Sequence, residues 1–116
     1  MKTIKVKTQT EIPDNFAGIV EFENEDKYWY KSGKTHREVH REDGPAVIWK
    51  NSFKQWWLDD CLIWYSGKSE INLTKCIILS KEPHPLYPTC QVWKYIDQYG
   101  IKEQIVIPGM EAWITE

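Results

Sequence analysis

The densest group of side chains able to do chemistry lies in one short segment, where the triplet His-Arg-Glu occurs twice, four residues apart. General acid–base catalysis needs a histidine or a carboxyl group held by partners, so an active site of hydrolase type would be sought here first. The structural interpretation is a solvated loop whose Arg–Glu and His–Asp pairs brace neighbouring turns. The residues concerned are His36, Arg37, Glu38, His40, Arg41, Glu42 and Asp43.

A metal site in this segment would depend on its two histidines. His36 and His40 could share one ion only on a helix or in a folded loop, with Asp43 or Cys61 completing the ligand set. On a strand they would lie about 13 Å apart, which is too far for one ion. The chain also has no glycine-rich phosphate loop and no GxSxG elbow. We therefore predict no metal, no cofactor and no enzymatic activity.

Length and composition are those of one globular domain spanning residues 1–116. Hydrophobic residues make up 41% of the chain and charged residues 28%, and a net charge of −2 gives no global attraction to nucleic acid or acidic membranes. Three cysteines without a CxxC pair suggest free thiols. The chain has no apolar stretch typical of a signal peptide or a membrane span, so we expect a cytoplasmic protein without a membrane partner.

Alternating apolar residues predict two similar β-hairpins. The first comprises Ile19–Glu23 and Lys27–Lys31, and the same frame returns 27 residues later. Residues of equivalent phase should form one apolar layer when the hairpins stack, because side chains alternate between the two faces of a strand. The equivalent positions are Val20 and Val47, Phe22 and Trp49, Asn24 and Asn51, Lys27 and Lys54, Trp29 and Trp56, and Tyr30 and Trp57.

Seven tryptophans and six tyrosines allow two interpretations of the aromatic residues. They either fill a small β-rich core or form an exposed binding face. Strand alternation places Tyr28 and Tyr30 opposite Trp29, and Trp57 opposite Trp56. Tyr28, Tyr30 and Trp57 are therefore the candidates for outward rings, unless a later segment covers them.

The strings WYKSGK at residues 29–34 and HREDGPAV at residues 40–47 resemble the repeats usually described as MORN-like, which occur in many bacterial, phage and giant-virus proteins. The resemblance covers residues 12–68. It departs from the pattern through four extra residues, Glu38–Arg41 or their copy, and through Asp59-Asp60-Cys61 in place of asparagine-glycine-lysine. It implies a mainly β fold, an antiparallel sheet of stacked hairpins.

Residues 71–116 are expected to form a small C-terminal cap, either α+β or all-β. A buried strand, or a helix, is expected at 71–80, followed by an extended proline-rich loop at 81–88. Residues 91–107 predict a hairpin, with a helix up to Gly100 as the alternative. The tail should form a one-turn helix or a strand that packs Trp113 against the sheet.

These observations favour a non-enzymatic protein-binding module. Because the resemblance points to repeats common in phage proteins, a virus-encoded inhibitor of a bacterial defence or host enzyme is a concrete version. One alternative is a small-nucleotide-sequestering protein in which rings stack a base and basic side chains hold phosphates, in a pocket that a homo-oligomer could build. The other is a hydrolase that uses the His/Glu/Asp cluster at 36–43. The predicted binding residues are Tyr28, Tyr30, Lys34, His36, Arg37, His40, Arg41 and Trp57.

Nucleic acid is not favoured as a partner. A basic series interleaved with Tyr and Trp runs from Lys27 to Lys54, but glutamates and aspartates in the same region offset it.

Overall fold

The computed structural model describes residues 1–68, 71–72 and 74–115. The chain is mainly β, with 47% strand and 6% helix, which confirms the predicted fold class. It divides into two compact units: unit 1 comprises Met1–Arg41 and Pro45–Ser66, and unit 2 comprises Glu42–Gly44 and Gly67–Glu116. The border at residues 66 and 67 lies close to the expected end of the hairpin repeats.

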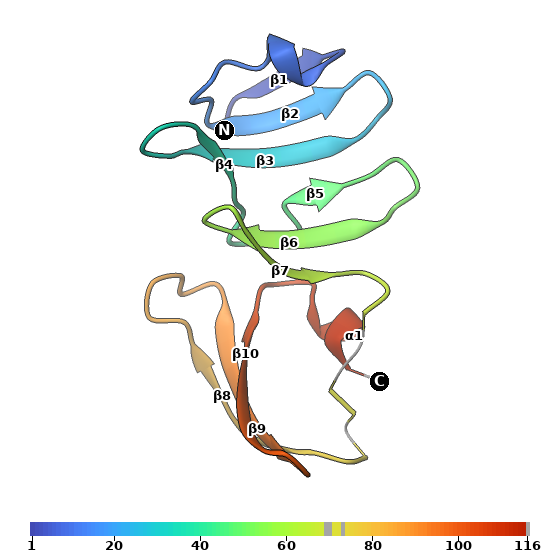
Figure 1. The fold of residues 1–116 in the computed structure, drawn as a ribbon, viewed down its shortest axis with the longest axis vertical. Helices are drawn as coiled ribbons and strands as arrows, with labels where there is room; N and C mark the ends of the chain where they lie inside the picture. The colour runs from blue at the N-terminus through green and yellow to red at the C-terminus, as the bar shows by residue number, and fades with distance from the viewer. Residues whose placement is uncertain (69–70, 73, 116) are drawn as a thin grey trace. The chain divides into compact units, whose positions relative to one another are not determined.

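Unit 1 is one sheet in the order β1-β2-β3-β5-β6-β7, with β4 also pairing with β3 (Figure 1). Only the edge strand β1 runs parallel to its neighbour; all other pairs are antiparallel. The predicted hairpins are present as β2–β3 and β5–β6. The strands are β1 Thr3–Val6, β2 Gly18–Phe22, β3 Lys27–Ser32, β4 Arg37–Val39, β5 Val47–Ile48, β6 Lys54–Leu58 and β7 Cys61–Tyr65, with a 3-10 helix at Gln9–Glu11.

The turns of the two hairpins share one side-chain device. The carboxamide oxygen of Asn24 accepts the N–H of Asp26 at 3.1 Å, and that of Asn51 accepts the N–H of Phe53 at 3.0 Å. The residue after each asparagine has positive φ, +78° at Glu25 and +70° at Ser52. Asparagine favours such turns because its side chain bonds the backbone two residues on, so the 27-residue frame has a physical basis in its turns.

The core of unit 1 lies on the face that carries Val20 and Val47. Tyr28 is the register partner of both valines, which are 0% and 1% exposed. On the N-terminal half of this face, Ile12 and Phe16 belong to the buried cluster with Val20. The expected apolar layer is therefore present at the valines. The opposite face buries the register pair Trp56 and Trp64.

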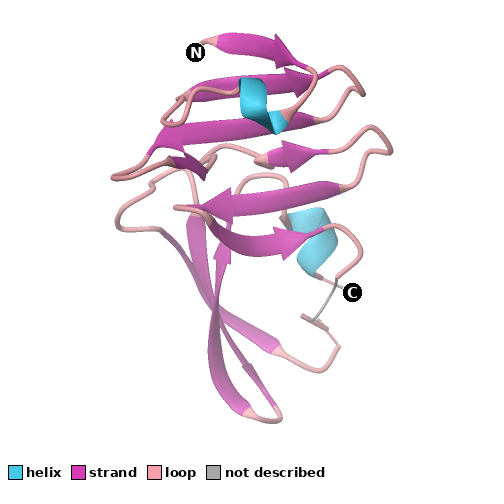
Figure 2. Cartoon of the chain, turned by 45° about the horizontal axis from the view of Figure 1, so that its top comes forward, coloured by secondary structure: helices cyan, strands magenta, loops and turns pink. Residues whose placement is uncertain are grey.

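Unit 2 contains a twisted three-stranded antiparallel sheet in the order β10-β9-β8 (Figure 2). Its elements are β8 Ile77–Pro83, β9 Gln91–Asp97, β10 Gly100–Val106 and the helix α1 Glu111–Ile114. Ile71 forms a parallel bridge to Thr115, so residues near the beginning and the end of the long stretch of unit 2 lie side by side. The most buried side chains of the unit are Ile71, Cys90, Trp93, Tyr95, Val106, Ile107, Met110 and Ile114.

Several expectations for the C-terminal part are wrong. The strand expected at 71–80 begins at Ile77 and is largely exposed rather than buried, and the part of that prediction at Leu73 lies outside the described residues. β8 extends into the proline-rich stretch as far as Pro83, because an edge strand tolerates proline. Residues 91–97 are strand, so the helical alternative is also wrong. Trp113 is 38% exposed, and Ile114 takes the buried position of α1 instead.

Within the described residues, no helix has the length and apolar character needed to cross a membrane.

Gly18 makes the close approach of β1 to β2 possible. It has φ +146°, and a Cβ atom there would lie 2.2 Å from the carbonyl oxygen of Lys2. Replacing it by alanine should cost about 2–5 kcal/mol, because backbone strain of about 1–2 kcal/mol adds to overpacking of about 1–3 kcal/mol. The matched control is Gly100→Ala, at φ +117° with no atom within 4 Å of the new Cβ. In chemical denaturation, Gly100→Ala should lower the free energy of unfolding only by the strain contribution of about 1–2 kcal/mol. Equal losses of free energy in the two variants would contradict this account.

Candidate functional site

Up to Arg41, the segment with the two His-Arg-Glu triplets forms backbone bridges within unit 1, and its last residue, Glu42, belongs to unit 2. Residues 37–39 are β4 and pair with the C-terminal half of β3. The chain then leaves that strand: the N–H of His40 donates to the carbonyl of Trp29 at 3.0 Å, and the N–H of Arg41 donates to the carbonyl of Trp57 at 3.1 Å. The segment thus joins the first hairpin to the second.

His40 is a buried hydrogen-bond acceptor. Only 8% of the residue is exposed, and its Nδ1 accepts the backbone N–H of Asp59 at 2.9 Å. Asp59 and Asp60 form the β6–β7 turn with φ +49° and +64°, a backbone conformation that costs energy outside glycine. A neutral ring that accepts at Nδ1 carries its proton on Nε2. This histidine therefore holds a strained turn in place.

Each triplet places its arginine over a ring of β3. The guanidinium of Arg41 lies 4.1 Å from the centroid of Trp29, and that of Arg37 lies 5.2 Å from the centroid of Tyr30. Arg41 also donates from Nη1 to the carbonyl of Pro45 at 3.1 Å. Cation–π contacts of this kind add stability where water is partly excluded. Both arginines are therefore engaged by unit 1 itself.

The first histidine occupies a more open position. The side chain of His36 is 61% exposed, and its Nε2 lies 3.5 Å from the carboxylate of Asp60. That carboxylate also accepts the N–H of Val39 at 3.1 Å. Glu38 lies 3.8 Å from Lys31, which also pairs with Asp59. The expected His–Asp contact is present between His36 and Asp60, whereas Glu38 pairs with a lysine rather than an arginine, and residues 37–39 are a strand rather than a solvated loop.

The predicted outward rings are less exposed than alternation suggested. Tyr30 is 8% exposed and belongs to the core, so its interpretation as an outward ring is wrong. Burial also raises the pKa of its phenol. Tyr28 is half-buried and stacks on Tyr30, with centroids 6.0 Å apart and ring planes 12° apart. Trp57 is half-buried, and its indole N–H donates to Gln55 at 3.0 Å. Lys34 is exposed.

Tyr28 also belongs to a line of neighbouring rings, which we call the aromatic strip: Tyr28, Trp49, Phe53 and Tyr65. Its members Trp49 and Tyr65 are exposed, and Tyr28 and Phe53 are half-buried. The indole N–H of Trp49 donates to the Tyr28 hydroxyl at 3.4 Å, and Trp49 stacks on Phe53 with centroids 5.1 Å apart. Phe53 and Tyr65 follow at 6.1 Å. Trp49 is 36% exposed and Tyr65 37%. The strip runs from Tyr28 on β3, past the turn of the second hairpin, to Tyr65 on β7.

The strip continues the core face of unit 1 beyond the part that Ile12 and Phe16 cover. Tyr28 is the register partner of Val47, and Gln55 pairs with both Val47 and Tyr65, so these positions share one face. The apolar layer predicted from the sequence included Trp49, which is 36% exposed in the structure. Phe53 and Tyr65 were missed. The only sequence signal for Tyr65 is its place in the string WYSGK, which repeats WYKSGK.

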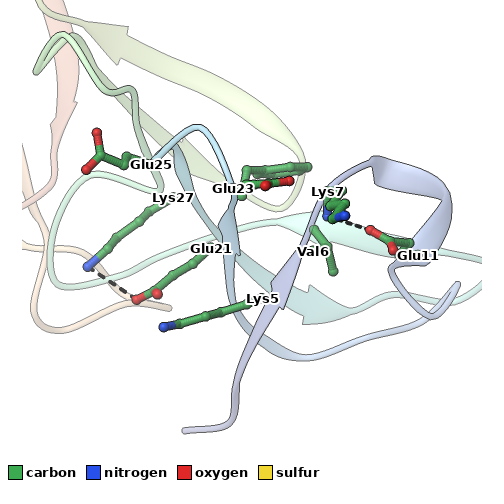
Figure 3. Close-up of a pocket in the computed structure, with 9 residues that line it drawn as sticks. Lys5, Val6, Lys7, Glu11, Glu21, Glu23, Glu25 and Lys27 are labelled. Carbon is green, nitrogen blue, oxygen red and sulfur yellow. Dashed lines mark hydrogen bonds and ion pairs between the residues drawn. The ribbon is translucent and has the colours of Figure 1, made fainter.

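Unit 1 also carries a hollow of about 620 Å³ at the ends of β1 and β2 (Figure 3). Lys27 pairs with Glu21 across it at 3.5 Å. The carboxylate of Glu11 accepts the N–H groups of Lys7 and Thr8, and these bonds lower its pKa. The lining residues are Lys5, Val6, Lys7, Glu11, Glu21, Phe22, Glu23, Glu25 and Lys27.

The lining of this hollow is mostly lysines and glutamates. Its lining has no histidine, cysteine or serine, and the perturbed carboxyl group, Glu11, is shifted towards the ionised form rather than towards a proton donor near neutral pH. The hollow was not predicted, because alternating lysines and glutamates in a sequence are also typical of a solvated strand edge.

Potential metal ligands and thiols lie apart from one another in the described part of the chain. No three His, Cys, Asp or Glu side chains there gather closely enough to hold a metal ion. The Sγ of Cys90 is buried and donates to the carbonyl of Glu42 at 3.2 Å, and burial raises the pKa of the thiol. A thiol kept protonated is a poor nucleophile. Cys61 is exposed, and Cys76 is half-buried.

Comparison with protein-family models, curated proteins and solved structures finds no match to the chain. The resemblance to MORN-like repeats therefore remains a prediction.

The two histidines of the segment should differ in their effect on stability. His40→Ala removes the acceptor of the Asp59 N–H and should lower the free energy of unfolding by about 1–3 kcal/mol. His36→Ala removes one exposed pair and should cost at most about 1 kcal/mol. Thermal or urea unfolding of both variants measures the difference. A small and equal loss of unfolding free energy in both variants would refute the assigned role of His40. Loss of a hydrolytic activity from a folded His36→Ala protein would support the hydrolase alternative.

Proposed function

We propose that the chain is a non-enzymatic protein-binding module and that the aromatic strip is its binding face. The observation that carries the proposal is the exposure of Trp49 and Tyr65, each above one third, in a line of rings that contact one another. Elsewhere in unit 1 the large rings Tyr30, Trp56 and Trp64 are buried. A core that needed bulky fillers alone would not leave this line open.

The physical properties of the strip suit a protein partner. Rings that already stack on one another lose little conformational freedom when a partner covers them, and Trp and Tyr are enriched among the residues that dominate binding energy. Polar groups border the strip. Asp26, Lys50 and Asn51 line an open hollow beside Trp49, and Lys50 pairs with Glu25 at 3.5 Å. An apolar centre with a polar rim is the usual anatomy of a protein interface.

The contacts of the charged segment argue against the two alternatives. A general base must be able to reach a substrate proton, whereas His40 is buried and accepts a backbone N–H. A phosphate clamp needs arginines that point to the ligand, whereas Arg37 and Arg41 lie over Tyr30 and Trp29. His40 and Arg41 support the binding face by holding the two hairpins together.

The concrete version of the proposal is a virus-encoded protein that inhibits a bacterial defence or host enzyme. It rests on the resemblance to repeats common in phage proteins. A host partner would meet the strip with apolar side chains and the rim with polar ones.

Affinity capture from a bacterial lysate tests the proposal when wild type is compared with the double variant Trp49→Ser/Tyr65→Ser. We expect a stoichiometric partner with wild type and at least about tenfold weaker capture with the double variant, because exposed aromatic anchors dominate such interfaces. Trp113→Ser is the matched control, since Trp113 is an equally exposed tryptophan, at 38%, outside the strip. Absence of a stoichiometric partner together with measurable turnover of any substrate would refute the proposal.

A thermal-shift panel of nucleotides and cyclic dinucleotides separates the sequestering alternative. We expect a flat response, because the arginines that would hold phosphates contact rings of β3. Binding at 100 times the dissociation constant would instead add about 2.7 kcal/mol of stability. A shift of that size that disappears in Lys34→Ala would establish nucleotide binding in place of the proposed function.

A further inference from the structure

The loop that joins β8 to β9 closes on a histidine. The Nδ1 of His84 accepts two backbone N–H groups, from Leu86 at 3.0 Å and from Tyr87 at 3.2 Å. The backbone N–H of His84 donates to the carbonyl of Cys90 at 2.9 Å. Its ring also lies against that of Tyr87, with centroids 5.3 Å apart. His84 therefore holds the loop at residues 84–90 at both ends.

The sequence around His84 explains this geometry. A residue before proline favours an extended backbone, and an acceptor side chain there can reach the N–H groups two and three residues on, as at the start of a helix. Pro85 suits the next position, because it has no N–H of its own to satisfy. Serine, threonine, aspartate or asparagine usually supplies the acceptor. A histidine in this place adds a group that changes its charge near neutral pH.

The closed loop requires the neutral form of the His84 ring. A neutral imidazole that accepts at Nδ1 carries its proton on Nε2, and a second proton turns Nδ1 from an acceptor into a donor. Both hydrogen bonds from the loop N–H groups would then be lost. The ring is half-buried, so protons from the solvent can reach it. Histidine ordinarily takes up such a proton at about pH 6.5.

The ring of His84 has no charged partner in the described part of the chain. It faces the phenol of Tyr87, which is neutral at this pH, and it forms no ion pair there. On the separate stretch of unit 2, the carboxylates of Glu42 and Asp43 act on the Cys90 thiol. The other two histidines, by contrast, each lie within 4 Å of a carboxylate. Protonation of His84 therefore gains no ion pair in exchange for the two hydrogen bonds.

The loop also anchors the separate stretch of unit 2. The hydroxyl of Thr89 and the thiol of Cys90 both donate to the carbonyl of Glu42, at 2.6 Å and 3.2 Å. The N–H of Cys90 donates to the carbonyl of Tyr87 at 2.8 Å, so the turn that His84 closes also positions these donors. Cys90 is 0% exposed in the closed loop. Opening the loop would uncover this thiol.

We propose that His84 is an acid-sensitive latch: protonation of its ring opens the loop at residues 84–90 and releases the carbonyl of Glu42. Because only the closed loop requires the neutral ring, the latch is closed above the ordinary titration range of histidine and opens as the pH falls through it, from about 6.5 to about 5. The device lies within unit 2 and is independent of the aromatic strip in unit 1.

The accessibility of the Cys90 thiol tests the latch. In a Cys61→Ser/Cys76→Ser background, Cys90 is the single thiol of the chain. Its rate of reaction with dithiodipyridine is divided by the rate for the urea-unfolded chain at the same pH, which removes the effect of pH on the thiol itself. We expect this ratio to rise at least about tenfold between about pH 7.5 and about pH 5, because two hydrogen bonds that hold the loop are lost.

His84→Asn in the same background is the decisive variant. The side-chain oxygen of asparagine can accept the same two N–H groups and does not titrate, so the ratio should stay low at both pH values. The matched control is His36→Asn, at a histidine whose side chain is 61% exposed in unit 1, and its ratio should rise as in the parent protein. Circular dichroism at both pH values checks that each protein is folded.

A second measurement needs no substitution at His84. In NMR spectra of the wild type, the amide signals of Leu86 and Tyr87 should change with the same midpoint as the His84 ring. Amide signals that stay constant while the ring titrates would overturn the proposal. A Cys90 ratio that is equal at both pH values in the parent protein would also overturn it, as would an equal rise in His84→Asn.

Discussion

Unit 1 depends on one constraint: β4 and β5 share a single edge of β3. β5 pairs only with Lys27 and Tyr28, while β4 pairs with the other half of the strand, from Tyr30 onward. Between the two paired stretches, the N–H of Trp29 donates to the carbonyl of Ala46, and the carbonyl of Trp29 accepts the N–H of His40. Arg41 covers the ring of that same tryptophan. Two hairpins with a short direct pairing are thus joined through one short, charged segment.

This arrangement engages His40 and both arginines within the unit and leaves His36 open to solvent. The histidine, arginines and aspartates of the segment and of the β6–β7 turn satisfy one another and the backbone, and buried polar groups without partners would be costly. The rings that the same hairpins leave open lie along the strand ends, at Trp49 and Tyr65. Charged groups contribute cohesion in this unit, and the aromatic surface that stays open is the face for which we propose a binding role.

The fold class, both hairpins and the 91–107 hairpin could be predicted because strand period and turn chemistry are local properties of a sequence. The burial of individual residues could not be predicted from the sequence. Tyr28 and Tyr30 have the same phase, yet their exposure depends on the covering residues Ile12 and Phe16, which arrive from a distant loop. The exposure of Ile77 likewise depends on pairing with β9, which follows it by more than ten residues. Tertiary context decided those positions, and local pattern carried no information about it.

The division of the chain between the units limits how the protein can be dissected. Glu42–Gly44 belongs to unit 2, although the residues on both sides belong to unit 1. The carbonyl of Glu42 accepts hydrogen bonds from Thr89 and Cys90 inside unit 2. A fragment that begins at Gly67 would lack this carbonyl, so cleavage at the obvious border cannot yield unit 2 intact. Unit 2 is therefore assembled from two separate stretches of the chain, and a self-sufficient version of it has to include Glu42–Gly44.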